Sequence, residues 1–139
     1  MWTAQTIVPV GDPPPPLAGL RPNFADYALG WGLRDYHGRR LVGHTGGLLG
    51  FVSRVMLVPE EGLGVVVLTN AEEGGAFNSI VYHLLDYYFH LPPTDWVSAF
   101  KAVEGKEEAD AAETVKKAAG AWDLKSKPSL PLEKVRRRL

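Results

Sequence analysis

Residues 51–70 read FVSRVMLVPEEGLGVVVLTN, two apolar and largely β-branched runs joined by a short polar segment. The segment at 59–62 contains a proline, two acidic residues and a glycine, which are residues that reverse the direction of a chain. The spacing therefore predicts a hairpin with strands at 51–58 and 63–69. Because Val65 to Leu68 form one continuous apolar run, we expect the second strand to lie centrally in a sheet.

A second hairpin is predicted just before the first one. Apolar side chains alternate with small residues at Tyr27, Leu29, Trp31 and Leu33, which is the period of a strand with one buried face. Gly38 can adopt the positive φ of a turn, and residues 39–45 then read as the returning strand. Together the two hairpins predict four antiparallel strands connected in sequence order.

After the strands the apolar period changes from two residues to that of a helix. One helical face contains Phe77, Ile80, Val81, Leu84, Leu85 and Tyr88. The polar residues Asn78, Ser79, His83 and Asp86 fall largely off this face. We expect the helix to pack on the sheet and to end before Pro92 and Pro93.

A further helix is predicted after the two prolines. Thr94 can cap its N-terminus, and its apolar stripe is Trp96, Phe100 and Val103. Residues 104–119 are rich in Ala, Glu and Lys and predict an exposed helix that stops at Gly120. The segment from Lys125 to Leu139 combines prolines with basic residues and predicts a frayed tail.

These patterns predict an α+β fold, with a four-stranded antiparallel meander, one packed helix and one or two trailing helices. Residues 1–25 hold six of the eleven prolines, so we expect an extended arm there. The predicted organisation is the arm at 1–25, an α+β domain at 26–103, and an exposed helix with a basic tail at 104–139.

Charge and composition limit the partners and the compartment. With 15 basic and 16 acidic residues the net charge is -1, which gives no case for nucleic acid or a membrane surface as partner. The absence of cysteine excludes a disulfide scaffold. The N-terminal residues lack a signal-peptide pattern, so a cytoplasmic location is the default, although longer relatives can be exported. His83 and His90 have too few acidic neighbours for a metal site, and we expect no cofactor.

The stretch LVGHTGGLLGF, residues 41–51, contains the candidate chemistry. His44 and Thr45 precede Gly46 and Gly47, so a polar pair lies beside backbone that has no side chains. Such backbone lets a substrate approach closely, and a fixed N–H can stabilise a developing oxyanion. The alternative is a glycine-rich strand against which another backbone packs.

Three segments in order, YALGWG, HTGGLLGF and GVVVLTN, resemble the C-terminal part of the serine β-lactamase and penicillin-binding-protein superfamily. The branch it most resembles contains class C-like enzymes and esterases of the family VIII type, in which His replaces Lys in the third active-site motif. The resemblance implies that His44, Thr45 and Gly46 form this motif, and that the Gly47 N–H is one arm of the oxyanion hole. Leu49 departs from the proline that many relatives carry.

The resemblance also implies two motifs upstream of the His-Thr-Gly strand, a Ser-x-x-Lys nucleophile and a Tyr motif. No serine occurs among the 43 residues before His44. We therefore expect the chain to be a piece of a hydrolase. A literal Ser-x-x-Lys does occur at Ser98 and Lys101, but the helix period places both opposite Trp96, facing water, where a lysine stays protonated.

Three hypotheses follow for the function. The chain is an incomplete serine hydrolase half, inactive or weakly active unless it forms a homo-oligomer or binds a complementing chain. Alternatively it is a minimal esterase that uses Ser98 and Lys101 with help from His44. The third hypothesis is a non-catalytic module that binds an acyl ligand or a partner. An active form would act on a small acyl ester or amide.

Overall fold

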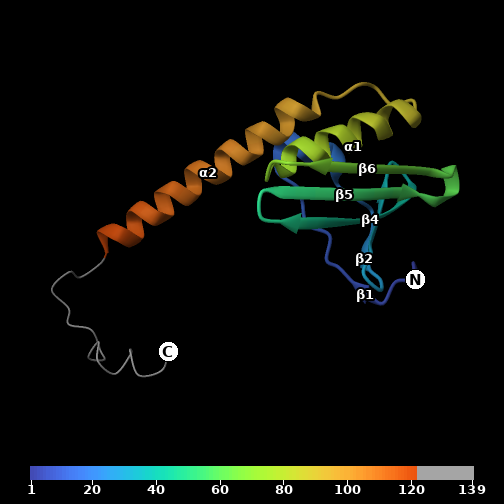
Figure 1. The fold of residues 1–139 in the computed structure, drawn as a ribbon, viewed down its shortest axis with the longest axis horizontal. Helices are drawn as coiled ribbons and strands as arrows, with labels where there is room; N and C mark the ends of the chain where they lie inside the picture. The colour runs from blue at the N-terminus through green and yellow to red at the C-terminus, as the bar shows by residue number, and fades with distance from the viewer. Residues whose placement is uncertain (122–139) are drawn as a thin grey trace. The chain divides into compact units, whose positions relative to one another are not determined.

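The computed structural model describes residues 1–121 (Figure 1). Two compact units divide the chain between Lys106 and Glu107. The first unit contains the sheet, its covering helix and the candidate site. The predicted basic tail at Lys125 to Leu139 lies outside the described residues. Within the described part of the chain, no helix combines the length and the apolar character needed to cross a membrane.

The first unit is built on one antiparallel sheet whose spatial strand order follows the sequence. Its strands are β1 (Thr6–Ile7), β2 (Ala25–Tyr27), β3 (Gly32–Tyr36), β4 (Arg39–Leu48), β5 (Phe51–Val58) and β6 (Leu63–Thr69). The predicted α+β class and consecutive hairpins are confirmed. The predicted number of four strands is wrong, because this sheet has six.

The additional strands arise at the N-terminal side of the sheet. The alternating pattern from Tyr27 to Leu33 belongs to two strands, since the chain turns between them: the Ala28 N–H donates to the Trp31 carbonyl at 2.7 Å. Gly30 takes a φ of 77° in this turn, and Leu29 is exposed. An alternating pattern does not reveal such a turn when the apolar residues resume in phase after it.

The proline-rich segment is more structured than an extended arm. β1 pairs with β2, and a 3-10 helix, η1 (Pro15–Leu20), follows it. Leu17 and Leu20 of η1 are buried in the main hydrophobic core. The prolines begin this helix because their fixed φ suits a first helical turn.

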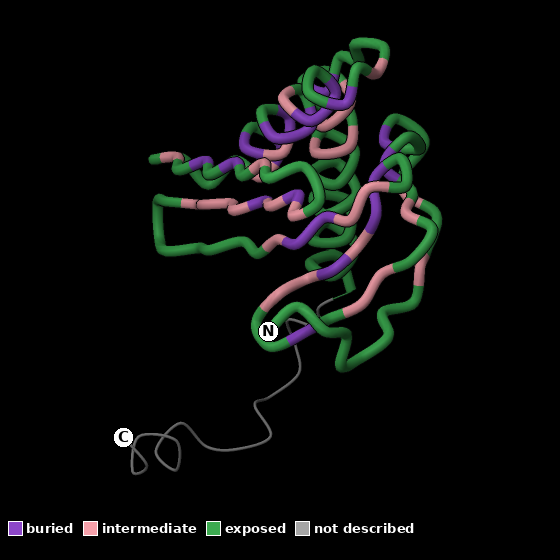
Figure 2. The backbone as a smooth tube through the Cα atoms, turned by 90° about the vertical axis from the view of Figure 1, so that its right-hand side faces the viewer, coloured by how far each residue is buried: buried purple, intermediate pink, exposed green. Residues whose placement is uncertain are grey.

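Helix α1 (Gly74–Tyr88) covers one face of the sheet, as Figure 1 shows, and the main core lies between them. Figure 2 shows the buried positions on α1 and on the strands beneath it. The sheet contributes Leu41, Met56, Val58, Val65 and Val67 to this core. On the opposite face a small cluster forms around Leu33 and Val42.

β6 is an edge strand, although its continuous apolar run predicted a central one. Val65 and Val67 point into the core under α1, whereas Val66 and Leu68 are exposed on the opposite face. The run is apolar throughout because one side of the strand is core and the other is an uncovered apolar surface. Leu48 and Phe51 are exposed and are cross-strand partners on β4 and β5.

Helix α1 is rotated about its axis relative to the predicted apolar face. Ser79 and Asp86, expected off that face, are buried, and Ile80 and Tyr88, expected on it, are exposed. The Asp86 carboxylate explains the rotation, because it accepts hydrogen bonds from buried donors on other elements. Its donors are the Tyr36 hydroxyl of β3 and the Trp96 indole Nε1, the latter at 2.6 Å.

The trailing segment forms one continuous helix, α2 (Trp96–Gly120). The helix ends at Gly120, as the sequence predicts. Asp95 caps its N-terminus in place of the expected Thr94: its carboxylate accepts the Ser98 N–H at 3.0 Å. This backbone hydrogen bond lowers the pKa of the Asp95 carboxyl. Trp96 is buried, and Phe100 and Val103 pack against the core as partly buried residues.

Candidate functional site

The site lies where β4 extends beyond its neighbour β3. The register of this pair ends at Gly32 opposite Gly43, so in the described structure β4 has no strand on that side from His44 onward. Residues His44 to Gly47 are exposed there, while β5 holds the other edge of the strand. Backbone on an open strand edge can reach a ligand directly.

The two glycines of this stretch have different surroundings. A β-carbon at Gly46 would lie 2.5 Å from the Ser53 hydroxyl oxygen, whereas one at Gly47 would meet no described atom within 4 Å. Close packing can therefore explain the glycine at 46 but not the one at 47. The open surroundings of Gly47 leave its backbone accessible to an acyl group.

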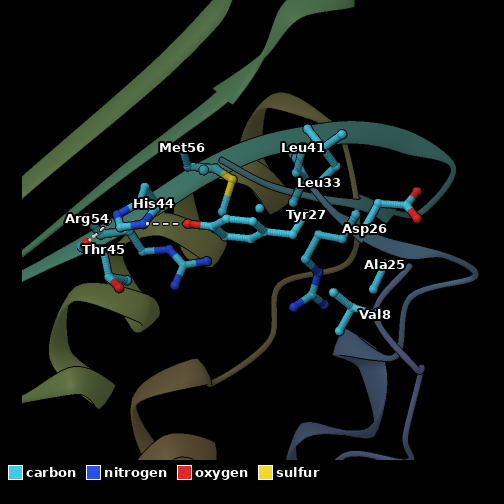
Figure 3. Close-up of a pocket in the computed structure, with 13 residues that line it drawn as sticks. Val8, Ala25, Asp26, Tyr27, Leu33, Leu41, His44, Thr45, Arg54 and Met56 are labelled. Carbon is cyan, nitrogen blue, oxygen red and sulfur yellow. Dashed lines mark hydrogen bonds between the residues drawn. The ribbon is translucent and has the colours of Figure 1, made fainter. Parts of the chain in front are cut away.

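The His44 imidazole is held between two oxygen atoms (Figure 3). Its Nδ1 lies 2.6 Å from the Thr45 carbonyl oxygen, and its Nε2 lies 3.3 Å from the Tyr27 hydroxyl. A carbonyl oxygen can only accept, so Nδ1 donates and Nε2 of the neutral ring carries the lone pair. His44 is therefore arranged as a base at Nε2.

A cavity of about 360 Å³ adjoins this histidine on the core side of the sheet. Tyr27, His44 and Thr45 form part of its wall, and Arg54 and Met56 of β5 form another part (Figure 3). The volume suits a small molecule. The site thus combines an imidazole, a hydroxyl and an open strand edge around a ligand-sized space.

Arg54 supplies positive charge to the same cavity. It stands opposite Thr45 in the β4–β5 register, and its buried Nε has no hydrogen-bond partner among residues 1–121. Burial lowers the pKa of the Arg54 guanidinium, with a further contribution from the charge of Arg34, another wall residue. The half-buried guanidinium has no acidic partner in the described part of the chain, which favours a bound anionic group.

Tyr27 and Arg54 were not among the residues that the sequence singled out. Tyr27 belongs to the YALGWG segment but was interpreted only as a strand residue. The position of Arg54 could have been found by pairing residues 45 and 54 across the hairpin, since the two-residue loop at Leu49 and Gly50 sets that register.

Ser98 and Lys101 lie in the first two turns of α2, and both side chains are exposed. Neither belongs to the wall of the cavity beside His44. The two histidines considered as ligands differ in setting, because α1 ends at Tyr88 and His90 lies beyond it with a φ of 55°. The described residues contain no cluster of three side chains suited to hold a metal ion.

Comparisons with known proteins place these segments in a family. A family model described as Beta-lactamase matches residues 5–88, which contain all six strands and α1. The chain is 31% identical over 109 residues to the Unguisins hydrolase ungD′ of Aspergillus campestris (strain IBT 28561), covering 75% of this chain and 19% of that protein. It is 33% identical over 95 residues to the Unguisins hydrolase ungD of Aspergillus violaceofuscus (strain CBS 115571), covering 67% and 16%.

No solved structure shows significant similarity to the chain. The chain spans less than a fifth of the length of the two curated relatives it matches. The family model covers more than half of this chain and includes the strand with His44, Thr45 and Gly46. On this match, the chain belongs to the beta-lactamase family.

Proposed function

We propose that this chain provides one wall of a serine hydrolase site of the esterase or β-lactamase type, acting on a small acyl ester or amide. The observation that carries the proposal is the open edge of β4, where the His44 imidazole and the bare backbone at Gly47 border a cavity. A fixed backbone N–H stabilises the oxyanion of acyl transfer, and an imidazole lone pair accepts a proton.

The proposal needs a nucleophile, which no residue of the cavity wall supplies. Among the described residues of that wall, the hydroxyl side chains are Tyr27 and Thr45. We propose that a further polypeptide segment brings the serine to the open edge of β4. Such a segment could come from a complementing chain or from another copy.

The cavity also suggests the charge of the substrate. Arg54 lies opposite Thr45, and Arg34 lies in the same wall, so two guanidinium groups face a small space. Since both have a buried Nε without a partner among the residues that the structure describes, a substrate with a negative group near its acyl carbon would satisfy them. Both relatives are named Unguisins hydrolase, which supports hydrolysis as the reaction class.

The minimal esterase that uses Ser98 and Lys101 is less well supported. Both side chains are exposed on α2, and neither contributes to the cavity beside His44. An exposed lysine ammonium is a poor base, because only burial removes its preference for the charged form.

Titration with a methylphosphonate monoester, a stable tetrahedral anion, tests the proposed site. We expect amide NMR shifts concentrated at Thr45 to Gly47, with saturation, and a loss of binding in Arg54→Gln. The matched control is Arg21→Gln, which removes an exposed guanidinium that pairs with Asp12. Shifts confined to other regions, or equal binding by both variants, would contradict the proposed function.

A further inference from the structure

Tyr27 reaches His44 along one cross-strand row of the sheet. Tyr27 pairs with Gly32, Gly32 pairs with Gly43, and Gly43 pairs with Met56. His44 directly follows Gly43, at the first position where β4 has no strand on the β3 side. Two successive glycines therefore leave this row without side chains between the phenol and β4.

The glycine in the middle of this row cannot be replaced without displacing its neighbours. A β-carbon at Gly43 would lie 2.9 Å from the Val55 carbonyl oxygen and 3.1 Å from the Met56 side chain. One at Gly32 would meet only the Gly43 carbonyl oxygen, at 3.5 Å. The Met56 side chain thus folds over Gly43, and Figure 3 shows it beside the Tyr27 ring. The phenol therefore lies beside Met56, with its hydroxyl within hydrogen-bond distance of His44.

The hydrogen bonds of the His44 imidazole determine which ring nitrogen donates and which accepts. The Thr45 carbonyl fixes the proton on Nδ1, so Nε2 must accept, and the Tyr27 hydroxyl at 3.3 Å is its donor. Tyr27 therefore contacts the nitrogen that a hydrolase would use as base. The ring centroids are 6.5 Å apart at 60°, so the two rings meet through the hydroxyl and not by stacking.

We propose that Tyr27 is a positioning residue for His44, holding the imidazole in its Nδ1–H tautomer with the Nε2 lone pair toward the cavity. This role rests on the proposed function, because a fixed tautomer matters only where the imidazole accepts a proton. Without the hydroxyl, the ring keeps one hydrogen bond and can turn about its Cβ–Cγ bond, which moves Nδ1 away from the Thr45 carbonyl and puts Cδ2 in its place. The Thr45 carbonyl keeps the proton on Nδ1 only while Nδ1 faces it, so the contact of Nε2 with the Tyr27 hydroxyl holds the ring in that orientation.

Imidazole ¹⁵N NMR of the neutral His44 ring tests the tautomer directly. In the wild-type chain we expect a protonated Nδ1 and an unprotonated Nε2. Tyr27→Phe keeps the aromatic ring and removes the hydroxyl, and we expect the two ¹⁵N shifts to move toward the average of both tautomers. The matched control is Tyr87→Phe, which removes an exposed hydroxyl on α1 and should leave the His44 spectrum unchanged. A wild-type ring protonated at Nε2, or an unchanged spectrum in Tyr27→Phe, would overturn the proposal.

Kinetics separate this role from the proposed function. If the chain, alone or with a complementing segment, hydrolyses an activated ester, Tyr27→Phe should lower kcat several-fold and change KM little. The double variant Tyr27→Phe/His44→Ala should be no slower than His44→Ala, because Tyr27 acts through the imidazole. Independent, multiplying losses would overturn the positioning role. Absent hydrolysis and absent phosphonate binding would defeat the proposed function, while the NMR result would still decide the role of Tyr27.

Discussion

Gly46 and Ser53 face each other across β4 and β5, and a β-carbon at Gly46 would lie 2.5 Å from the Ser53 hydroxyl oxygen. The Ser53 β-carbon itself would be 3.9 Å away, an ordinary contact. A β-carbon at this glycine of the His-Thr-Gly stretch would therefore conflict with one hydroxyl group of the neighbouring strand. The glycine at position 46 thus has a steric explanation that does not depend on the chemistry of the site.

Gly46→Ala should destabilise the chain modestly, because Ser53 must leave its rotamer to make room. The expected loss is about 0.5–1.5 kcal/mol in the free energy of unfolding. In a Ser53→Ala background the same substitution should be close to neutral, since the conflicting oxygen is absent. Urea unfolding of the four proteins measures this coupling. Equal losses in both backgrounds would show that the hydroxyl is not the cause.

Gly43→Ala should be more damaging than Gly46→Ala. Its β-carbon would lie 2.9 Å from the Val55 carbonyl oxygen, and a backbone atom within a paired strand cannot rotate away. We expect a loss of about 1–3 kcal/mol by urea unfolding. Gly47→Ala is the control, because its β-carbon meets no described atom within 4 Å. A Gly43→Ala chain as stable as Gly47→Ala would contradict the close approach of β4 and β5.

The hydrogen bonds to Asp86 connect β3, α1 and α2. Trp96→Phe removes the indole donor and leaves a buried carboxylate oxygen without its partner, which costs about 1–3 kcal/mol. Tyr36→Phe should have a similar effect through the other oxygen. Because both donors serve one carboxylate, the double variant should depart from additivity in thermal unfolding. Strictly additive losses would mean that Asp86 does not link the two aromatic residues.

The Asp86 cluster also shows which parts of the fold could be predicted from the sequence. The period of apolar residues located the helix at 77–88 and the hairpins, because local spacing reflects a strand or a helix directly. It could not locate the buried face of α1. Asp86 is polar by type, and its donors Tyr36 and Trp96 are 50 and 10 residues away.

The same limit applies to the candidate site. The stretch at His44 to Gly47 was predicted from its residue types, and the structure places it on an exposed strand edge beside a cavity. The contact between Tyr27 and His44 depends on the register of three strands, and that register depends on the turn at Ala28 to Trp31. The alternating residues from 27 to 33 conceal this turn, so the contact could not be predicted.

His90 lies two residues beyond the end of α1 and adopts the left-handed conformation, with a φ of 55°. The Leu91 N–H donates to the Asp86 carbonyl at 2.9 Å and the His90 N–H to the Tyr87 carbonyl, which is the cap that favours glycine. His90→Gly should therefore stabilise the chain by about 0.5–1 kcal/mol. His83→Gly is the matched control, an exposed histidine inside the same helix, and should destabilise by a similar amount. Changes of the same sign in thermal unfolding would contradict the cap.

Self-association should occur through the uncovered side of the sheet. β6 is an edge strand without charged residues or proline, and its own side chains Val66 and Leu68 are exposed. Such an edge can pair with a second copy. Sedimentation velocity should show a dimer or larger species at about 50 µM, a concentration at which weak patches associate. Val66→Lys should shift the chain to a monomer, while Val115→Lys, which adds the same charge on α2, should not. A monomer in the wild-type chain would exclude this surface as a self-pairing edge.

Catalysis by the chain alone should be weak and should depend on His44. Oxyanion stabilisation acts on charge that a nucleophile has begun to create, so the open edge of β4 contributes little without one. We expect slow hydrolysis of p-nitrophenyl acetate and no turnover of β-lactams. His44→Ala should lower the rate about tenfold or more.

Ser98→Ala and Lys101→Ala are the decisive controls for this prediction. Both side chains are exposed on α2 and absent from the cavity wall, so neither substitution should change the slow hydrolysis. A fluorophosphonate probe, which labels only an activated serine, should likewise leave the chain unlabelled. If instead Ser98→Ala abolishes both a rapid esterase activity and covalent labelling, the nucleophile is Ser98. The chain would then be a complete small esterase, and a segment supplying the serine at β4 would be unnecessary.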